Sequence, residues 1–273
     1  MITKMTSYSN HVDFRKISAA EIFISEPEPA WFGNDPNEPQ NTNWTNSNWL
    51  KSRFHFSFAE WSGGRTHMGS LRVVNDDLIQ PARGFGTHGH RDMEIITYVL
   101  KGGLTHQDSM GTEETLGRGS IQYMTAGTGV MHSEKNLSSN QELRLIQSWI
   151  LPKNKGLNPR YGSFQGNNGN GNHRLNRWHH LVSDIGQNGQ VQINQDFNLF
   201  VSEIDTQKSL SFELSQGRQA YAVCVEGSLK IKSMLLERHE ACEIRGGNEP
   251  VRINFDGQKG EEKTHVLLYE MKD

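Results

Sequence analysis

Two short segments, Thr87-His88-Gly89-His90 and His132-Ser133-Glu134, decide how this chain is interpreted, because together they carry three imidazoles and one carboxylate. On an extended strand, residues two positions apart share a face, so His88 lies with His90 and His132 lies with Glu134. Two such strands side by side, with these faces inward, would bring four ligand groups to one cavity. The alternative is a partly exposed polar pair at His88 and His90 and a salt-bridged surface pair at His132 and Glu134.

Three neutral imidazoles and a carboxylate make a site of borderline hardness for a divalent ion. Such a set suits Fe, Mn, Co, Ni, Cu or Zn at about 2.0 to 2.2 Å, and disfavours Ca and Mg. A structural zinc site would more usually be closed and rich in cysteine. Four ligands on the rim of a barrel leave open positions at its mouth, where a substrate or dioxygen would bind.

Short apolar runs alternate with glycine-rich turns on both sides of these segments, which predicts an all-β sandwich or barrel. In the first half the predicted strands are 54–58, 71–74, 95–100, 121–124 and 143–151, and in the second half they are 191–193, 199–201, 210–212, 221–225, 229–231, 251–253 and 266–269. The turn at 98–104 can be laid on 223–229, which indicates a duplicated β-barrel.

The length of 273 residues also suits two domains. We expect a metal-binding domain over 1–160, a linker over 161–180 and a second domain over 181–273. An Asn- and Pro-rich stretch at about 31–49 is predicted to be a long loop or insertion. Extending the alignment of the halves places Glu213 and Ser215 at the first histidine pair, and Arg252 and Asn254 at His132 and Glu134. The second domain therefore lacks the ligand set.

Composition excludes several classes of protein. The net charge of −3 and a pI near 6.5 give no electrostatic case for nucleic acid or an anionic membrane. No apolar signal region opens the chain and no run approaches the roughly twenty residues that span a bilayer, so we expect a soluble cytoplasmic protein. Cys224 and Cys242 are then expected to be buried free thiols. No nucleophile elbow, Walker loop or dinucleotide fingerprint is present.

Other candidate residues carry weaker signals. Glu94 shares parity with the first histidine pair and is either an acceptor behind the metal ligands or an edge carboxylate. His106, close to Asp108, follows a turn and is predicted to face solvent, and the pair at His179 and His180 is interpreted as a surface pair. The aromatic cluster is interpreted as core in preference to a ligand platform: Trp44, Trp49, Phe54, Phe56, Phe58 and Trp61.

The stretches Gly84-Phe85-Gly86-Thr87-His88-Gly89-His90-Arg91-Asp92-Met93-Glu94 and Met124-Thr125-Ala126-Gly127-Thr128-Gly129-Val130-Met131-His132-Ser133-Glu134 closely resemble the pirin family of the cupin superfamily. Within that family the chain is most similar to bacterial pirin-like bicupins described as quercetin 2,3-dioxygenases. The similarity is dense over about 48–161 and diffuse afterwards. It implies a bicupin, with two jelly-roll β-sandwich barrels and a metal only in the first, held by His88, His90, His132 and Glu134. The loop at 31–49 departs from the compact start of the bacterial members.

The leading hypothesis is a metal-dependent dioxygenase, with Fe(II) ahead of Cu, Ni, Mn, Co or Zn, that opens the heterocyclic ring of a flavonol such as quercetin with O₂ and releases carbon monoxide. Glu134 would accept the substrate hydroxyl proton. The competing hypothesis is a non-enzymatic metal-binding regulator or redox sensor that acts through a protein partner. A bicupin isomerase or sugar-modifying enzyme is a third reading. The sequence identifies neither the physiological substrate nor the oligomeric state.

Overall fold

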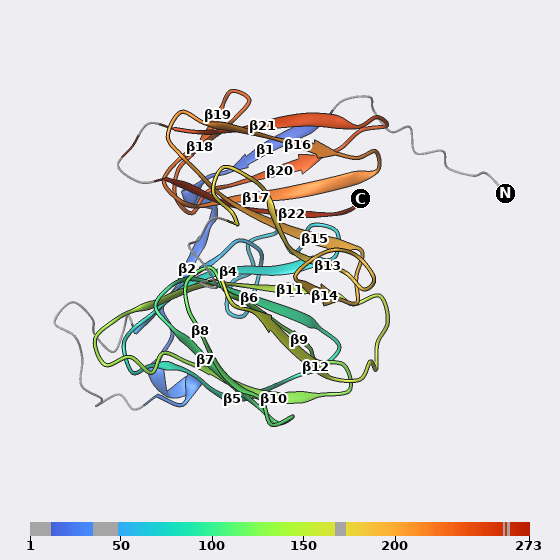
Figure 1. Ribbon diagram of the computed structural model, residues 1–273. Coiled ribbons are helices and arrows are strands. Elements are labelled where there is room, and N and C mark those ends of the chain that lie inside the picture. Colours follow the sequence, from blue (N-terminus) through green and yellow to red (C-terminus); the bar gives the residue numbers. More distant parts are fainter. Residues whose placement is uncertain (1–11, 35–48, 167–172, 259, 261–262) are drawn as a thin grey trace. The chain divides into compact units, whose positions relative to one another are not determined.

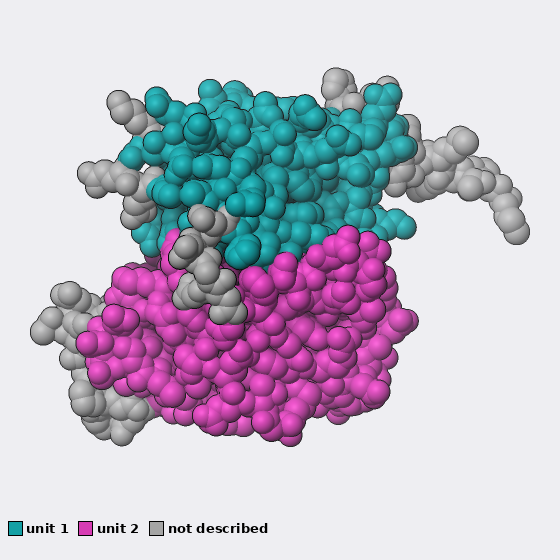
Figure 2. Space-filling view, viewed as in Figure 1, with its two compact units in different colours: residues 1–19, 173–181, 196–273 teal, residues 20–172, 182–195 magenta. Residues whose placement is uncertain are grey.

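The computed structural model describes residues 12–34, 49–166, 173–258, 260 and 263–273, and these residues form a nearly all-β protein (Figure 1). The chain divides into two compact units (Figure 2). Unit 1 contains residues 1–19, 173–181 and 196–273, and unit 2 contains residues 20–172 and 182–195. The predicted all-β bicupin class is therefore confirmed.

Unit 2 consists of two antiparallel sheets. The larger sheet has the strand order β12-β9-β6-β11-β4-β3-β2, and the smaller has the order β5-β10-β7-β8. Figure 1 shows the smaller sheet facing the larger one across the interior of the unit. The strands of these two sheets are β2 (Phe23–Ser25), β3 (Leu50–Phe54), β4 (Leu71–Ile79), β5 (Gly84–His90), β6 (Glu94–Lys101), β7 (Leu104–Asp108), β8 (Glu113–Leu116), β9 (Ile121–Thr125), β10 (Val130–Lys135), β11 (Leu143–Ile150) and β12 (Arg160–Phe164). Strand β14 (Val191–Ile193) also falls within unit 2, but it pairs parallel with β13 (His179–Asp184) and belongs to neither of these sheets.

Unit 1 is built in the same way. Strands β1-β20-β17-β22-β15 follow one another in its larger sheet, and its smaller sheet has the order β16-β21-β18-β19. These strands are β1 (Asp13–Ile17), β15 (Phe197–Ile204), β16 (Ser209–Leu214), β17 (Arg218–Glu226), β18 (Leu229–Ile231), β19 (Met234–Leu236), β20 (Ala241–Arg245), β21 (Val251–Gly257) and β22 (Thr264–Lys272). Strand β13 (His179–Asp184) begins in unit 1 and ends in unit 2.

The apolar strand residues explain these sheets, because the inward face of each strand supplies the core. In unit 2, Trp49, Ile79, Val99 and Leu145 belong to one fully buried cluster. In unit 1, inward residues of β17, β20 and β22 form a larger cluster that includes Cys224 and Cys242. Both cysteines are free and buried, as predicted, and burial raises the pKa of the Cys242 thiol to about 12.

The predicted strands are present, but several are longer than predicted and one is displaced. The strand placed at 54–58 lies at Leu50–Phe54 instead, because the backbone of Phe58 turns back to bridge with Trp61. The stretch at 31–49 is not wholly a loop, since η2 (Pro29–Phe32) is a short 3-10 helix that follows η1 (Ala19–Glu21), and Trp49 is buried core. Residues 35–48 of that stretch, with Trp44, lie outside the described residues.

The units differ from domains drawn by chain order alone. Strand β1 pairs antiparallel with β20, so the first described strand belongs to the same unit as the end of the chain. Strand β12, which includes the start of the predicted linker at 161–180, pairs with β9 inside unit 2. The boundary expected near residue 160 does not coincide with the units, because strand pairing crosses it in both directions. In the described parts of the chain, no helix is long and apolar enough to cross a membrane.

Candidate metal centre and its cavity

The two histidine-bearing segments lie on neighbouring strands of the smaller sheet in unit 2. Strand β5 pairs antiparallel with β10, and His88 stands directly opposite His132. The register shifts between His132 and Glu134, which marks an irregularity of the β-bulge type; such bulges re-aim side chains near functional sites. At the same point β5 approaches β10 closely, since a Cβ on Gly84 would overlap the carbonyl oxygen of Glu134.

Three imidazoles converge in space. One ring nitrogen from each of His88, His90 and His132 lies within 4.8 Å of the others. The ring centroid of His132 lies 4.5 Å from that of His88 and 4.8 Å from that of His90, and the Nε2 atoms of His88 and His132 are 3.1 Å apart. At this separation the two nitrogens can share a proton or bind one cation together.

The backbone fixes the tautomer of one of these rings. The carbonyl of Gly86 can only accept, so Nδ1–H of His88 donates to it over 2.8 Å and Nε2 keeps its lone pair. A hydrogen bond from the outer nitrogen to a carbonyl is the usual way in which a metal-binding histidine is oriented. Burial, together with the neighbouring imidazoles, lowers the pKa of both His90 and His132 to about 3. These rings are therefore neutral and able to bind a cation at neutral pH.

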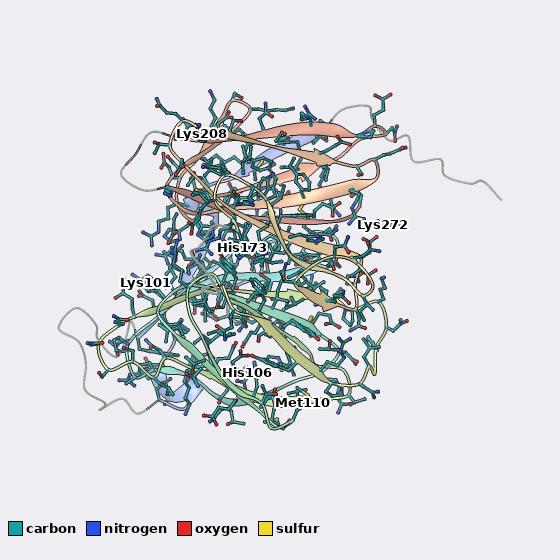
Figure 3. The ribbon with its side chains drawn as sticks, viewed as in Figure 1. Lys101, His106, Met110, His173, Lys208 and Lys272 are labelled. Carbon is teal, nitrogen blue, oxygen red and sulfur yellow. The ribbon has the colours of Figure 1, made fainter. Side chains whose placement is uncertain are left out.

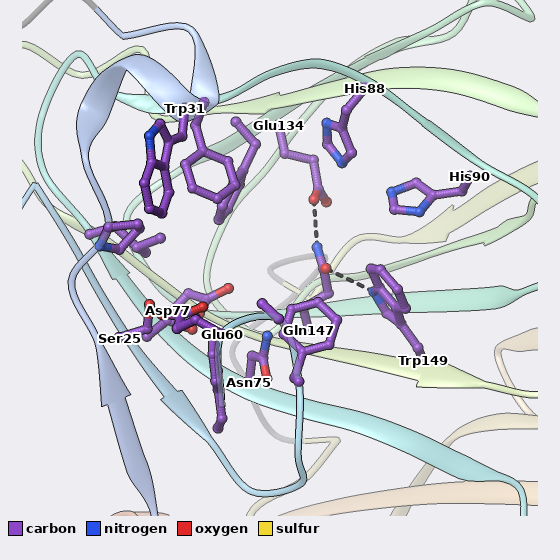
Figure 4. A pocket seen from close by; sticks show the side chains of 18 residues that line it. Ser25, Trp31, Glu60, Asn75, Asp77, His88, His90, Glu134, Gln147 and Trp149 are labelled. Carbon is purple, nitrogen blue, oxygen red and sulfur yellow. Dashed lines mark hydrogen bonds between the residues drawn. The ribbon is translucent and has the colours of Figure 1, made fainter. Parts of the chain in front are cut away.

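Glu134 is fully buried beside this cluster and is held by three side-chain donors. Its Oε1 accepts hydrogen bonds from Thr97 over 3.1 Å and from Gln122 over 2.7 Å. Its Oε2 accepts one from Gln147 over 2.6 Å, and since a carboxylate has about four acceptor positions, one remains. The indole N–H of Trp149 donates to Oε1 of Gln147 over 2.9 Å (Figure 4). This contact orients the Gln147 side chain so that its amide NH₂ group donates to Glu134.

His106 lies on the other side of His132, and its predicted exposure is wrong. His106 lies in unit 2 (Figure 3) and is fully buried on β7. Its Nε2 lies 3.0 Å from the carboxylate of Asp108, and Tyr161 stacks on its ring with the centroids 4.6 Å apart. The reason is that β7 pairs with β10, which places His106 opposite Glu134. His106, His132 and Glu134 form a second cluster within the same 4.8 Å limit. The two clusters share His132.

Glu94 does not belong to either cluster. The chain turns between β5 and β6, where Asp92 has a φ of 50°, so the parity with His88 and His90 is lost. Glu94 is buried and accepts hydrogen bonds from Thr125 over 2.7 Å and Asn194 over 2.8 Å. It is an interior carboxylate of unit 2, and burial raises its pKa.

The pair at His179 and His180 is only half-buried and forms no metal cluster among the described residues. Nε2 of His180 lies 2.9 Å from Oδ1 of Asn198, and the ring of His180 stacks on Phe200 with centroids 4.4 Å apart. Both of these contacts of His180 lie within unit 1.

A cavity of about 380 Å³ opens beside the metal-ligating candidates, within the range of small-molecule sites (Figure 4). His88, His90 and Glu134 lie along one side of it. The interpretation of the aromatic cluster as core holds for Trp49 and Phe56, which are fully buried. It also holds for Phe54, which is buried but lines the cavity as well. The half-buried Phe58 lines the cavity together with Trp31, Phe32, Phe85 and Trp149.

Fold and site together define a protein of two β-barrel units, one of which combines a cluster of imidazoles with an aromatic cavity. Comparison with known proteins gives the family. Residues 38–150 match the family model described as Pirin, and residues 180–271 match the one described as Quercetinase C-terminal cupin domain. A curated relative, quercetin 2,3-dioxygenase from Escherichia coli, is 38% identical over 228 residues, which are 83% of this chain and 93% of the relative. The chain belongs to the pirin family, as its motifs predicted.

Solved structures agree with this assignment. The bacterial pirin YhhW from Escherichia coli, in complex with nickel(II), has a TM-score of 0.78 at 28% identity, over 95% of this chain and 99% of that one. A protein from Geobacillus kaustophilus has a TM-score of 0.71 at 19% identity, over 96% of each chain, and supports the fold alone.

Proposed function

We propose that this protein is a metal-dependent dioxygenase that opens the heterocyclic ring of a flavonol-like substrate with O₂ and releases carbon monoxide. The observation that carries the proposal is the convergence of His88, His90 and His132, because two of these histidines line an aromatic cavity together with Glu134. The names of the curated relatives support the same reaction class. Fe(II) is the proposed metal, and Cu, Ni, Mn, Co or Zn would suit the same donors.

The three imidazoles and the remaining acceptor position of Glu134 would hold the ion. When bound, a divalent metal supplies a Lewis acid that stabilises the enolate-like oxygen of a flavonol. The donor set fits this role, because the rings of His90 and His132 are neutral and one acceptor position of the Glu134 carboxylate remains.

The chain's own residues bind and orient the substrate. Phe54, Phe58 and Trp149 would pack against its planar rings and exclude water from the reacting oxygen. When substrate binds, Glu134 would accept the hydroxyl proton of the flavonol at this same remaining position, so it would be a ligand of the ion only without substrate. Gln122 and Gln147 keep the carboxylate in place through their hydrogen bonds.

The test combines metal analysis with turnover. Protein purified without chelators is assayed for bound first-row metals, and oxygen uptake with quercetin is then measured after loading with each metal. We expect equimolar consumption of O₂ and quercetin, with release of carbon monoxide. His88→Ala should lose both metal and turnover, whereas His67→Ala, at an exposed histidine outside the cavity, should keep both.

Metal binding without turnover with any of these ions would overturn the dioxygenase proposal. That result, together with metal-dependent binding of a protein partner, would favour the regulator or redox sensor. A cytoplasmic location and the absence of nucleic-acid binding remain predictions from the sequence.

A further inference from the structure

The part of the cavity formed by β2, β3 and β4 differs from the imidazole side, because its polar groups are mostly acceptors. The hydroxyl of Ser25 donates to Glu60, and the hydroxyl of Ser52 donates to Asp77. Both serine protons are therefore engaged by carboxylates. Figure 4 shows Ser25, Glu60 and Asp77 gathered together, away from His88 and His90.

Asn75 adds a further acceptor to this group. It lies two residues before Asp77 on β4, so both side chains share the inward face. Asn75 is 5% exposed, lines the cavity, and its Oδ1 is buried without a hydrogen-bond partner among the described residues. A buried carbonyl without a partner is unfavourable, so a ligand that supplies a donor to it would bind more tightly.

Asp77 is itself buried, and it lies near the charges of Asp76 and Glu134 as well as that of Arg53. Burial is the main reason that the pKa of its carboxyl rises to about 7, and the two acidic neighbours contribute. Above about pH 7, where this carboxyl is ionised, a hydrogen-bond donor from a ligand would offset the cost of its buried charge.

We propose that Asn75 and Asp77 form a second recognition point in the cavity, which selects aromatic substrates that carry donor hydroxyl groups on the ring remote from the imidazole cluster. This inference rests on the proposed function, because it assumes an aromatic substrate whose other end meets the imidazoles. The preferred ligand class is a planar polyphenol in preference to a flavonol with a single hydroxyl.

The two polar regions of the cavity come from different sheets of unit 2. The histidines come from β5 and β10 of the smaller sheet, whereas Asn75 and Asp77 come from β4 of the larger sheet. Aromatic side chains line the cavity that both groups share. A rigid planar ligand with polar groups at both ends would match the polar walls and the apolar space between them.

The test compares two ligands by quenching of tryptophan fluorescence, which needs no turnover. Quercetin carries hydroxyls on both of its ring systems, and 3-hydroxyflavone carries only the hydroxyl beside the carbonyl. The ratio of their dissociation constants is measured for the wild-type chain, Asp77→Asn and Asn75→Leu, before and after metal loading. Asp77→Asn keeps an oxygen that can accept from Ser52, but it replaces the other carboxylate oxygen with an amide NH₂ group, which is a donor. Asn75→Leu removes the unpartnered Oδ1 and keeps a side chain of similar volume.

We expect the preference for quercetin over 3-hydroxyflavone to fall about tenfold or more in each variant, which is the effect of one lost hydrogen bond. Trp31→Ala, which changes the aromatic wall, should weaken both ligands alike and leave the ratio unchanged. An unchanged ratio in both Asp77→Asn and Asn75→Leu would overturn the inference. If the protein turns over quercetin but the ratio of dissociation constants is the same in both variants, the proposed function holds and this inference is wrong. If the ratio changes but no metal supports turnover, this recognition point holds and the proposed function is wrong.

Discussion

Replacing Asp77 with Asn should stabilise the protein, and the gain should depend on pH. The carboxyl of Asp77 is buried, and its pKa rises from 3.8 to about 7 chiefly because burial disfavours the charged form. Asn has nearly the same shape and can still accept the hydrogen bond from Ser52. The substitution therefore removes a buried charge and keeps the local packing.

The direction of this pH dependence follows from the protons that the folded and unfolded chains bind. Between about pH 4 and pH 7 the folded chain keeps a proton on Asp77 that the unfolded chain, with a pKa near 3.9, has released. The stability of the wild-type chain therefore falls as the pH rises through this window, and is level again above it. Since each pKa unit corresponds to about 1.36 kcal/mol, Asp77→Asn should gain up to ~4 kcal/mol above pH 7 and nothing at pH 4.

Guanidinium unfolding at pH 4.5 and pH 8, followed by tryptophan fluorescence, measures this difference. Asp13→Asn, at an exposed aspartate, is the matched control and should follow the wild-type chain at both pH values. If Asp77→Asn and the wild-type chain change in parallel between the two pH values, the buried carboxyl does not hold its proton and the reasoning fails.

Three further substitutions test the site and its support. Gln147→Leu removes a donor to Glu134, so metal affinity, measured by competition with a chromophoric chelator, should fall by about 10- to 100-fold, and an unchanged affinity would contradict a role for this contact. Gly84→Ala forces a Cβ against the backbone of Glu134 and should lower the free energy of unfolding in urea by about 1 to 3 kcal/mol. A smaller loss would show that the two strands do not approach each other so closely. Arg144→Leu removes the two hydrogen bonds that Arg144 donates to the buried carboxylate of Asp76. The free energy of unfolding in the same assay should fall by about 3 to 5 kcal/mol, and an unchanged value would refute this expectation.

Local pattern was sufficient for most strands and for the convergence of the histidines. Apolar alternation and glycine-rich turns place the strands of both units, and spacing by two residues places His88 with His90 on one face. The same rule failed for Glu94, since a turn of three residues separates it from β5. It failed for His106 because burial there depends on which strands pair with β7.

The hydrogen-bond partners of Glu134 were not predicted, because strands far apart in the sequence supply them. Thr97, Gln122 and Gln147 come from β6, β9 and β11, whose order in the sheet is set by tertiary pairing. A signal was nevertheless present. Each of these residues interrupts an apolar strand, as Asn75 and Asp77 do on β4, and a polar side chain on an otherwise buried strand needs a partner in the interior.

The pairing of β1 with β20 has a consequence for biosynthesis. The ribosome makes β1 before the strands of unit 2, yet its partner strand β20 emerges only after them. Unit 2 can assemble its sheets while β1 still presents unpaired edge groups, the kind of edge that invites contact with other nascent chains. Removing β1 would accordingly damage unit 1, whose remaining strands are made after those of unit 2, and would spare unit 2.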